Sequence, residues 1–221
     1  MKNLHHPVVR IVCIAAVFLA GCHDHGPDRS TVSRVRLVDA VPPPARIDLS
    51  LNGRTVAKHV EYGSNSGYTM LDPGHYALGV RSDRSEPAIV NGELVRGASY
   101  TVIAMPVGGA GDLGLSVIRE KEALTIRDQA TLRFIAASSG MGKLSLALNN
   151  VIAIDGLKYK TESEPVHLKP GDYDLKLWTG DDASQLLGPS PVHVDGGKSY
   201  TVVAMGRRVD GSLTLRIFED K

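Results

Sequence analysis

The sequence is poor in aromatic residues and in cysteine, and it has no excess of charge of either sign. Only 5% of the 221 residues are aromatic, and two cysteines are too few for a disulfide framework. The 25 Lys and Arg residues are balanced by 24 Asp and Glu residues, so nothing predicts a nucleic-acid partner. No apolar run is long enough for a transmembrane helix. With 43% hydrophobic residues, the composition is that of a globular protein with an aliphatic core.

The N-terminal segment has the parts of an export signal in the right order. A positively charged start precedes an apolar run at residues 11–20. The run ends in Leu19-Ala20-Gly21-Cys22, which resembles the lipobox of bacterial lipoproteins. In that motif small residues precede the cleaved bond, and the thiol of the cysteine carries the lipid. The alternative is an ordinary secretory signal in which Cys22 has no special role.

The lipobox resemblance implies a signal peptide at 1–21, lipid attachment at Cys22 and a flexible tether over 22–33. The protein would then be bound to the membrane through this lipid, since each buried methylene adds about 0.8 kcal/mol. His23 stands where an aspartate would retain such proteins at the inner membrane in enterobacteria. We therefore expect a location in the cell envelope, at the outer membrane, with the periplasmic or surface-facing orientation left open.

The rest of the chain consists of two copies of one sequence pattern. Val35-Arg36-Leu37-Val38 recurs 97 residues later as Leu132-Arg133-Phe134-Ile135, and Ser99-Tyr100-Thr101-Val102 recurs 100 residues later as Ser199-Tyr200-Thr201-Val202. Matched blocks at constant offsets are hard to produce by chance. We therefore predict two domains of one fold. The first repeat covers 34–119 and the second 130–221, and a linker at 120–129 joins them.

Each copy shows the two-residue periodicity of β-strands. Residues 47–51 alternate between apolar and polar side chains, and Asn52-Gly53 then gives a strong hairpin signal. Residues 100–105 and 200–205 are apolar at nearly every position, so both faces of these strands should be covered. The tyrosine that opens each of these runs should anchor a sandwich corner through its hydroxyl. The sequence thus predicts an all-β protein with two tandem antiparallel β-sandwiches, immunoglobulin-like or transthyretin-like.

The repeated pattern resembles a bacterial and archaeal family of exported proteins, the domain of unknown function 4397 (DUF4397). The resemblance rests on Pro73-Gly74-x-Tyr76, Gly97-x-Ser99-Tyr100-Thr101-Val102 and Asp210-Gly211-x-Leu213. It covers about residues 34–118 and 131–218, which is most of the chain after the tether. The resemblance implies a β-sandwich module, often present in tandem, and no established activity.

The sequence contains no complete catalytic, metal-binding or cofactor motif. Gly63-Ser64-Asn65-Ser66-Gly67 has asparagine where a nucleophile elbow needs serine. Gly140-Met141-Gly142-Lys143 lacks the first glycine and the final Ser or Thr of a phosphate loop. Acidic residues rarely align between the two copies, which argues against a duplicated active site. We therefore predict a protein that is not an enzyme and needs no cofactor or metal.

Trp178 is the candidate residue for contact with a partner. By alternation it shares the polar face of its strand with Asp174 and Lys176, and an acidic loop with Asp181 and Asp182 follows. A large aromatic side chain on a wet face suits an interface anchor. The alternative is that Trp178 packs against the other copy or covers the end of its sandwich.

Three functions are compatible with these features. The first is a non-enzymatic envelope lipoprotein whose two modules bind or space an envelope or extracellular partner. The second is a polysaccharide-binding accessory module, because sugars stack on exposed aromatic rings. The third, an envelope hydrolase, requires distant residues to converge in the fold. The oligomeric state and the relative orientation of the two domains are not predicted.

Overall fold

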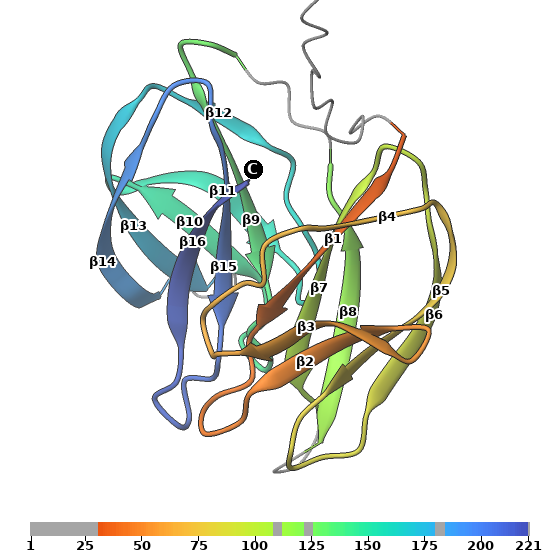
Figure 1. Cartoon of the computed structure of the whole chain (residues 1–221). Helices are drawn as coiled ribbons and strands as arrows, with labels where there is room; N and C mark the ends of the chain where they lie inside the picture. The colour runs from red at the N-terminus through yellow and green to blue at the C-terminus, as the bar shows by residue number, and fades with distance from the viewer. Residues whose placement is uncertain (1–30, 108–111, 122–125, 180–183, 221) are drawn as a thin grey trace, which may run out of the picture.

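Two β-sandwiches, one for each repeat, make up the computed structural model, which describes residues 31–107, 112–121, 126–179 and 184–220 (Figure 1). The first contains β1 (Ser33–Asp39), β2 (Ile47–Leu51), β3 (Arg54–Val60), β4 (Thr69–Leu71), β5 (Gly74–Arg81), β6 (Ala88–Leu94), β7 (Ser99–Pro106) and β8 (Leu113–Arg119). The second contains β9 (Ala130–Ala136), β10 (Leu144–Leu148), β11 (Val151–Leu157), β12 (Val166–Leu168), β13 (Gly171–Thr179), β14 (Gln185–Val194), β15 (Ser199–Met205) and β16 (Thr214–Asp220). The predicted all-β fold with two tandem sandwiches is confirmed.

Both sandwiches share one topology. Sheet A has the strand order β4-β1-β7-β8 and sheet B the order β3-β2-β5-β6. In the second sandwich, sheet C has the order β12-β9-β15-β16 and sheet D the order β11-β10-β13-β14. The sheets are not purely antiparallel, because β1 pairs in parallel with β7 and β9 with β15. Every other pairing among the described strands is antiparallel.

The predicted hairpin after β2 is present, and its counterpart follows β10. Asn52 and Gly53 have φ values of 49° and 78°, and Asn149 and Asn150 have values of 50° and 69°. Positive φ at both central residues is the geometry of a tight two-residue hairpin, and Asn and Gly tolerate it best. The second repeat therefore keeps the turn although it has lost the glycine.

A tyrosine hydroxyl anchors each sandwich, as the sequence predicts. The Tyr100 hydroxyl accepts a hydrogen bond from the backbone N–H of Val95 at 2.9 Å. The Tyr200 hydroxyl accepts the equivalent bond from Asp195 at 3.0 Å. Both rings are buried beside cores made mainly of Val, Leu, Ile and Ala. The two tyrosines thus have the same structural role.

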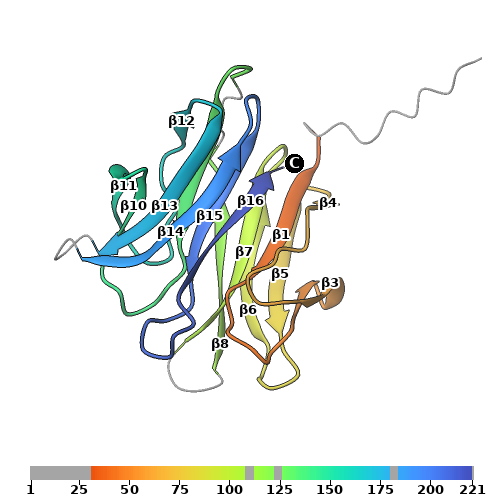
Figure 2. The same cartoon turned by 90° about the vertical axis from the view of Figure 1, so that its left-hand side faces the viewer.

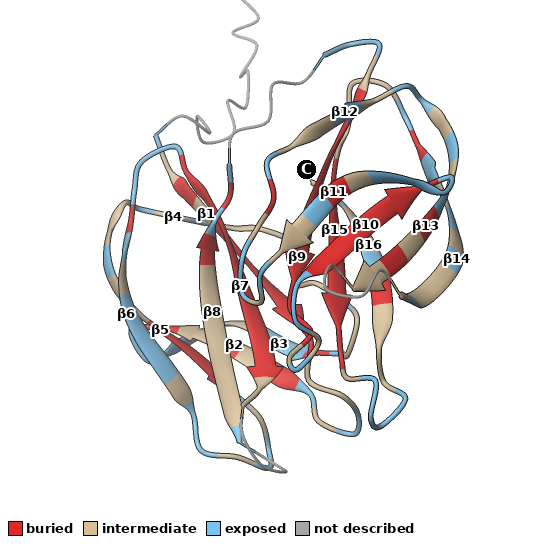
Figure 3. Cartoon of the chain, turned by 180° about the vertical axis from the view of Figure 1, so that it is seen from behind, coloured by how far each residue is buried: buried red, intermediate tan, exposed pale blue. Residues whose placement is uncertain are grey.

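The outer faces of sheets A and C pack against each other, so the four sheets stack in the order B-A-C-D (Figure 2). The apolar part of this interface contains Val38, Ala40, Ile103, Met105, Ile118, Ile135, Ala137, Val203 and Met205. Strands β7 and β15 are therefore buried on both faces, in agreement with their continuous apolar sequence (Figure 3). The second face of each is covered by the other repeat, which fixes how the two sandwiches are oriented.

Candidate functional site

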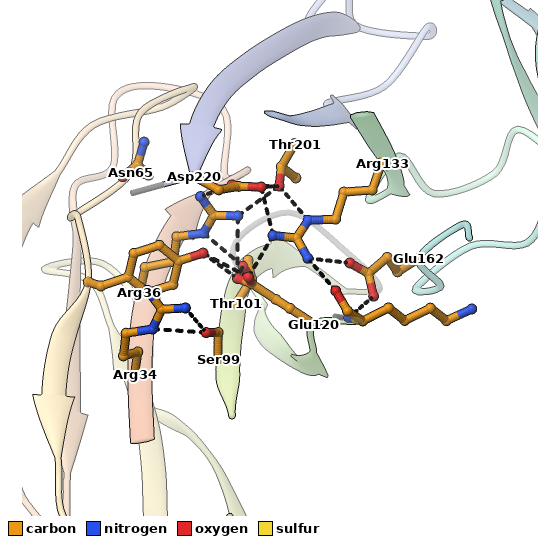
Figure 4. A network of polar contacts seen from close by, with 12 residues as sticks. Arg34, Arg36, Asn65, Ser99, Thr101, Glu120, Arg133, Glu162, Thr201 and Asp220 are labelled. Carbon is orange, nitrogen blue, oxygen red and sulfur yellow. Dashed lines mark hydrogen bonds and ion pairs between the residues drawn. The ribbon is translucent and has the colours of Figure 1, made fainter. Parts of the chain in front are cut away.

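A buried charge network lies within the interface between the two sandwiches (Figure 4). Arg36 in β1 and Arg133 in β9 occupy equivalent positions of the repeats, as do Glu120 and Asp220. The Nη1 of Arg36 lies 2.8 Å from Asp220 Oδ1, and its Nη2 lies 3.4 Å from Glu120 Oε1. The Nη2 of Arg133 lies 2.7 Å from Glu120 Oε2 and 2.7 Å from Asp220 Oδ2. Each guanidinium thus binds one carboxylate from each repeat.

Two threonines complete the network with matching contacts in their own repeats, and Thr201 also accepts a bond from Arg36 Nη2 at 2.9 Å. The Nε of Arg36 donates to the Thr101 hydroxyl at 2.8 Å, and that hydroxyl donates to Glu120. The Nε of Arg133 donates to Thr201 at 2.8 Å, and Thr201 donates to Asp220. The interface therefore has an approximate two-fold symmetry that relates one repeat to the other.

The two repeats differ in the residues that flank the two arginines. The Cζ of Arg36 lies 4.8 Å from the centroid of the Tyr68 ring, which covers the guanidinium. The Tyr68 hydroxyl donates to Glu120 at 2.7 Å. Burial raises the pKa of this hydroxyl, so it stays a donor. On the other side, Glu162 Oε1 lies 3.3 Å from Arg133 Nη1. Burial raises the pKa of Glu162, and Arg133 opposes this shift.

The charged side chains of the network are almost fully buried. The side chains of Arg36, Glu120, Arg133 and Asp220 are 1%, 4%, 7% and 10% exposed. Burial lowers the pKa of Arg133, but the surrounding carboxylates raise it by more, so its charge is permanent. The network therefore links the two repeats through buried ion pairs.

Trp178 lies on the outer face of sheet D, away from this interface. It is in register with Ser145 on β10 and Gln185 on β14, and it is half-buried. The preceding Leu175 and Leu177 are buried in the second core, so the predicted alternation along β13 is confirmed. The Trp178 Nε1 is buried and has no hydrogen-bond acceptor among the described residues.

The other predicted site residues, Cys22, Asp181 and Asp182, lie outside the described residues. Within the described ranges, no group of three or more His, Cys, Asp or Glu residues could hold a metal ion. In the same ranges, no helix is long and apolar enough to cross a membrane.

The sequence matches the family described as domain of unknown function (DUF4397) over residues 33–147 and 142–221. The chain belongs to the DUF4397 family. No curated protein matches this DUF4397 chain.

Two solved structures have a distant likeness to this DUF4397 protein. A family 26 carbohydrate-binding module of Eubacterium rectale Amy13K, solved with maltoheptaose, is 11% identical, with 86% of this chain and 97% of that chain covered and a TM-score of 0.25. A leucine-rich repeat protein from Bacteroides thetaiotaomicron is 14% identical, with 80% and 26% covered and a TM-score of 0.23. Neither likeness carries an argument about function.

Grooves open to solvent occur in the described part of this DUF4397 protein, and two of them lie beside elements already described. One runs between the sandwiches beside Tyr68, Met70 and Phe218 and has a volume of about 590 Å³. The other lies on the outer face of sheet B, where Arg81 occupies the position equivalent to Trp178, and has a volume of about 550 Å³. The sequence analysis identified neither groove, because each combines residues from segments far apart in the chain.

Proposed function

We propose that this protein is a non-enzymatic lipoprotein of the cell envelope, anchored through Cys22, whose two joined sandwiches bind or space an envelope partner. The lipobox-like segment supports the anchor and the location. The observation that carries the binding role is the buried interface, which joins the repeats into one body. Because the outer faces of sheets A and C are buried in this contact, the outer faces of sheets B and D lie on opposite sides of the molecule.

Lipid attachment can be tested at the cysteine itself. In cells that express the full chain, we expect Cys22→Ser to abolish incorporation of labelled palmitate and to leave an unprocessed precursor, because no thiol remains to accept the lipid. Cys13→Ser is the matched control, since Cys13 lies within the predicted signal peptide. We expect this variant to be labelled and processed as the original chain is. Labelling and normal processing of Cys22→Ser would contradict the proposal.

Partner binding can be tested with the purified mature chain carrying Cys22→Ser, added to isolated envelopes. The proposal predicts saturable retention on envelopes that survives removal of the lipid. Absence of retention on membranes, on cell-wall material and on envelope polysaccharide alike would contradict a binding role.

A second candidate function, polysaccharide binding by the outer face of sheet D, is favoured by Trp178. Trp178 is only partly buried on that face, which suits stacking against a sugar ring. This candidate predicts that Trp178→Ala lowers retention on purified envelope polysaccharide by about tenfold or more. Val209→Ala, at a residue 90% exposed in the loop between β15 and β16, should leave it unchanged. Equal retention of both variants and the original chain would exclude this role for Trp178.

A further inference from the structure

We infer that the groove on the outer face of sheet B binds an anionic glycan, a sugar chain that carries carboxylate or phosphate groups. This inference rests on the proposed function, because it names a ligand class for one of the two outer faces. The groove volume of about 550 Å³ falls within the range of roughly 300–1,000 Å³ that is typical of ligand sites. Its lining is polar and consists of Arg46, Asp48, His59, Arg81, Ser82 and Asp83.

Asp48 is a fixed acceptor within the groove. Its Oδ1 accepts the backbone N–H of His59 at 2.9 Å, and its Oδ2 lies 3.1 Å from Arg81 Nη2. Partial burial raises the pKa of Asp48, but these two donors lower it by more in sum, so the carboxylate is ionised at neutral pH. A carboxylate accepts about four hydrogen bonds, and these two contacts leave capacity for sugar hydroxyls.

Two guanidinium groups supply the positive charge. The side chains of Arg46 and Arg81 are 63% and 59% exposed. Each forms one ion pair through Nη2, Arg46 with Glu61 at 3.4 Å and Arg81 with Asp48 at 3.1 Å. The Arg46 pair is exposed on both sides and therefore weak, and a guanidinium has five N–H donors in a fork that matches carboxylate and phosphate oxygens. Each arginine therefore keeps N–H donors for an anionic group on a sugar, and Asp83, which also lines the groove, can accept from sugar hydroxyls.

His59 is held in a strained backbone conformation at this groove. Its φ is +53°, at a point where the pairing of β2 with β3 shifts register. The second repeat has the same irregularity with Gly156 at φ +62°, and its N–H donates to Ser145 at 3.0 Å. Glycine adopts this φ without strain, whereas a side chain carries a cost. The first repeat thus keeps an imidazole at a place where the fold itself requires only glycine.

The second repeat does not reproduce the site. Lys143, Ser145, Gly156 and Trp178 stand at the positions of Arg46, Asp48, His59 and Arg81. The imidazole and both guanidinium groups are therefore absent from the equivalent positions, and the carboxylate beside Ser145 is that of Asp155, which accepts its hydroxyl at 2.6 Å. The inference applies to the first repeat alone, and the second repeat supplies matched control positions.

The experiment measures binding of the purified mature chain carrying Cys22→Ser to three polymers. These are polygalacturonate, which carries carboxylates, a phosphorylated mannan, and dextran, which is neutral. We expect binding to at least one of the two anionic polymers and none to dextran; which of them binds identifies the anionic group.

Three further variants test whether the groove is the site. We expect Arg81→Gln to weaken binding of the anionic polymer by about tenfold or more, because charge-assisted hydrogen bonds are lost. His59→Gly should weaken binding while leaving thermal stability equal or higher, since glycine relieves the positive φ. Lys143→Gln, at the second-repeat position equivalent to Arg46, should leave binding unchanged.

Equal binding to dextran, or anionic binding that neither Arg81→Gln nor His59→Gly reduces, would overturn the inference. Retention on isolated envelopes without binding to either anionic polymer would also overturn it, while the proposed function would stand. If the protein also showed no retention on isolated envelopes, both the inference and the proposed binding function would be contradicted.

Discussion

Arg133→Met is expected to destabilise the protein by about 3–5 kcal/mol, because it removes one partner from a buried charge network. Arg133 contacts the carboxylates of Glu120, Glu162 and Asp220. Methionine fills much of the space but leaves Glu120 and Asp220 with one guanidinium, that of Arg36, and leaves Glu162 without its arginine. Urea unfolding at pH 7 measures the loss in the free energy of unfolding.

Arg46→Met is the matched control, since Arg46 forms an ion pair whose side chains are 63% and 68% exposed. We expect a loss of less than about 1 kcal/mol for this variant. Similar small losses for both variants would show that the network contributes little to holding the repeats together.

The second large effect is expected at Asp39, a carboxylate buried without a charged partner. Asp39 is 0% exposed, and its Oδ1 accepts the N–H of Val41 at 2.8 Å. Its Oδ2 has no hydrogen-bond partner among the described residues. Burial raises the pKa of Asp39 from 3.8 to about 7, against a smaller lowering by the Val41 N–H. Between about pH 4 and pH 7 the Asp39 carboxyl is therefore protonated in the folded state and ionised in the unfolded chain.

The raised pKa of Asp39 contributes to the free energy of unfolding. This contribution is complete below about pH 4 and is lost as pH rises through about 7. Asp39→Asn keeps an acceptor for Val41 and removes the titration. We expect it to raise the free energy of unfolding at pH 8 by up to about 4 kcal/mol and to change it little at pH 4. Paired urea titrations across this range measure the difference. Asp128→Asn, at an exposed position, is the control. A constant difference between Asp39→Asn and the original chain at all pH values would refute the assignment.

The sequence predicts much of this fold because its signals are local. The Asn52-Gly53 turn, the alternation along β2 and the tyrosine anchors each depend on a few neighbouring residues. The constant offsets between the copies extend each of these signals to the second repeat. The parallel pairing of β1 with β7 was not predicted, because it joins strands that are far apart in the chain.

The charge network and the sheet B groove required the structure. Arg36 and Arg133 are visible in the repeated blocks, and Glu120 and Asp220 share the offset of 100 residues. Glu120 nevertheless falls within the predicted linker, and its side chain is buried against Arg133. A charge within an otherwise apolar strand, repeated in both copies, is the signal that could have revealed the pairing. The groove offers no such signal, because its residues do not recur.

The two-fold symmetry of the interface has a consequence for how the sandwiches stay together. Equivalent residues of both repeats meet across it, as in the isologous contact of a homodimer. A homodimer dissociates when it is diluted, whereas here the two halves are segments of one polypeptide. The short linker between the repeats gives the two halves an effective concentration on the order of millimolar. The paired state is therefore independent of how many copies of the protein a cell makes, and a protein of low abundance still presents both outer faces as one unit.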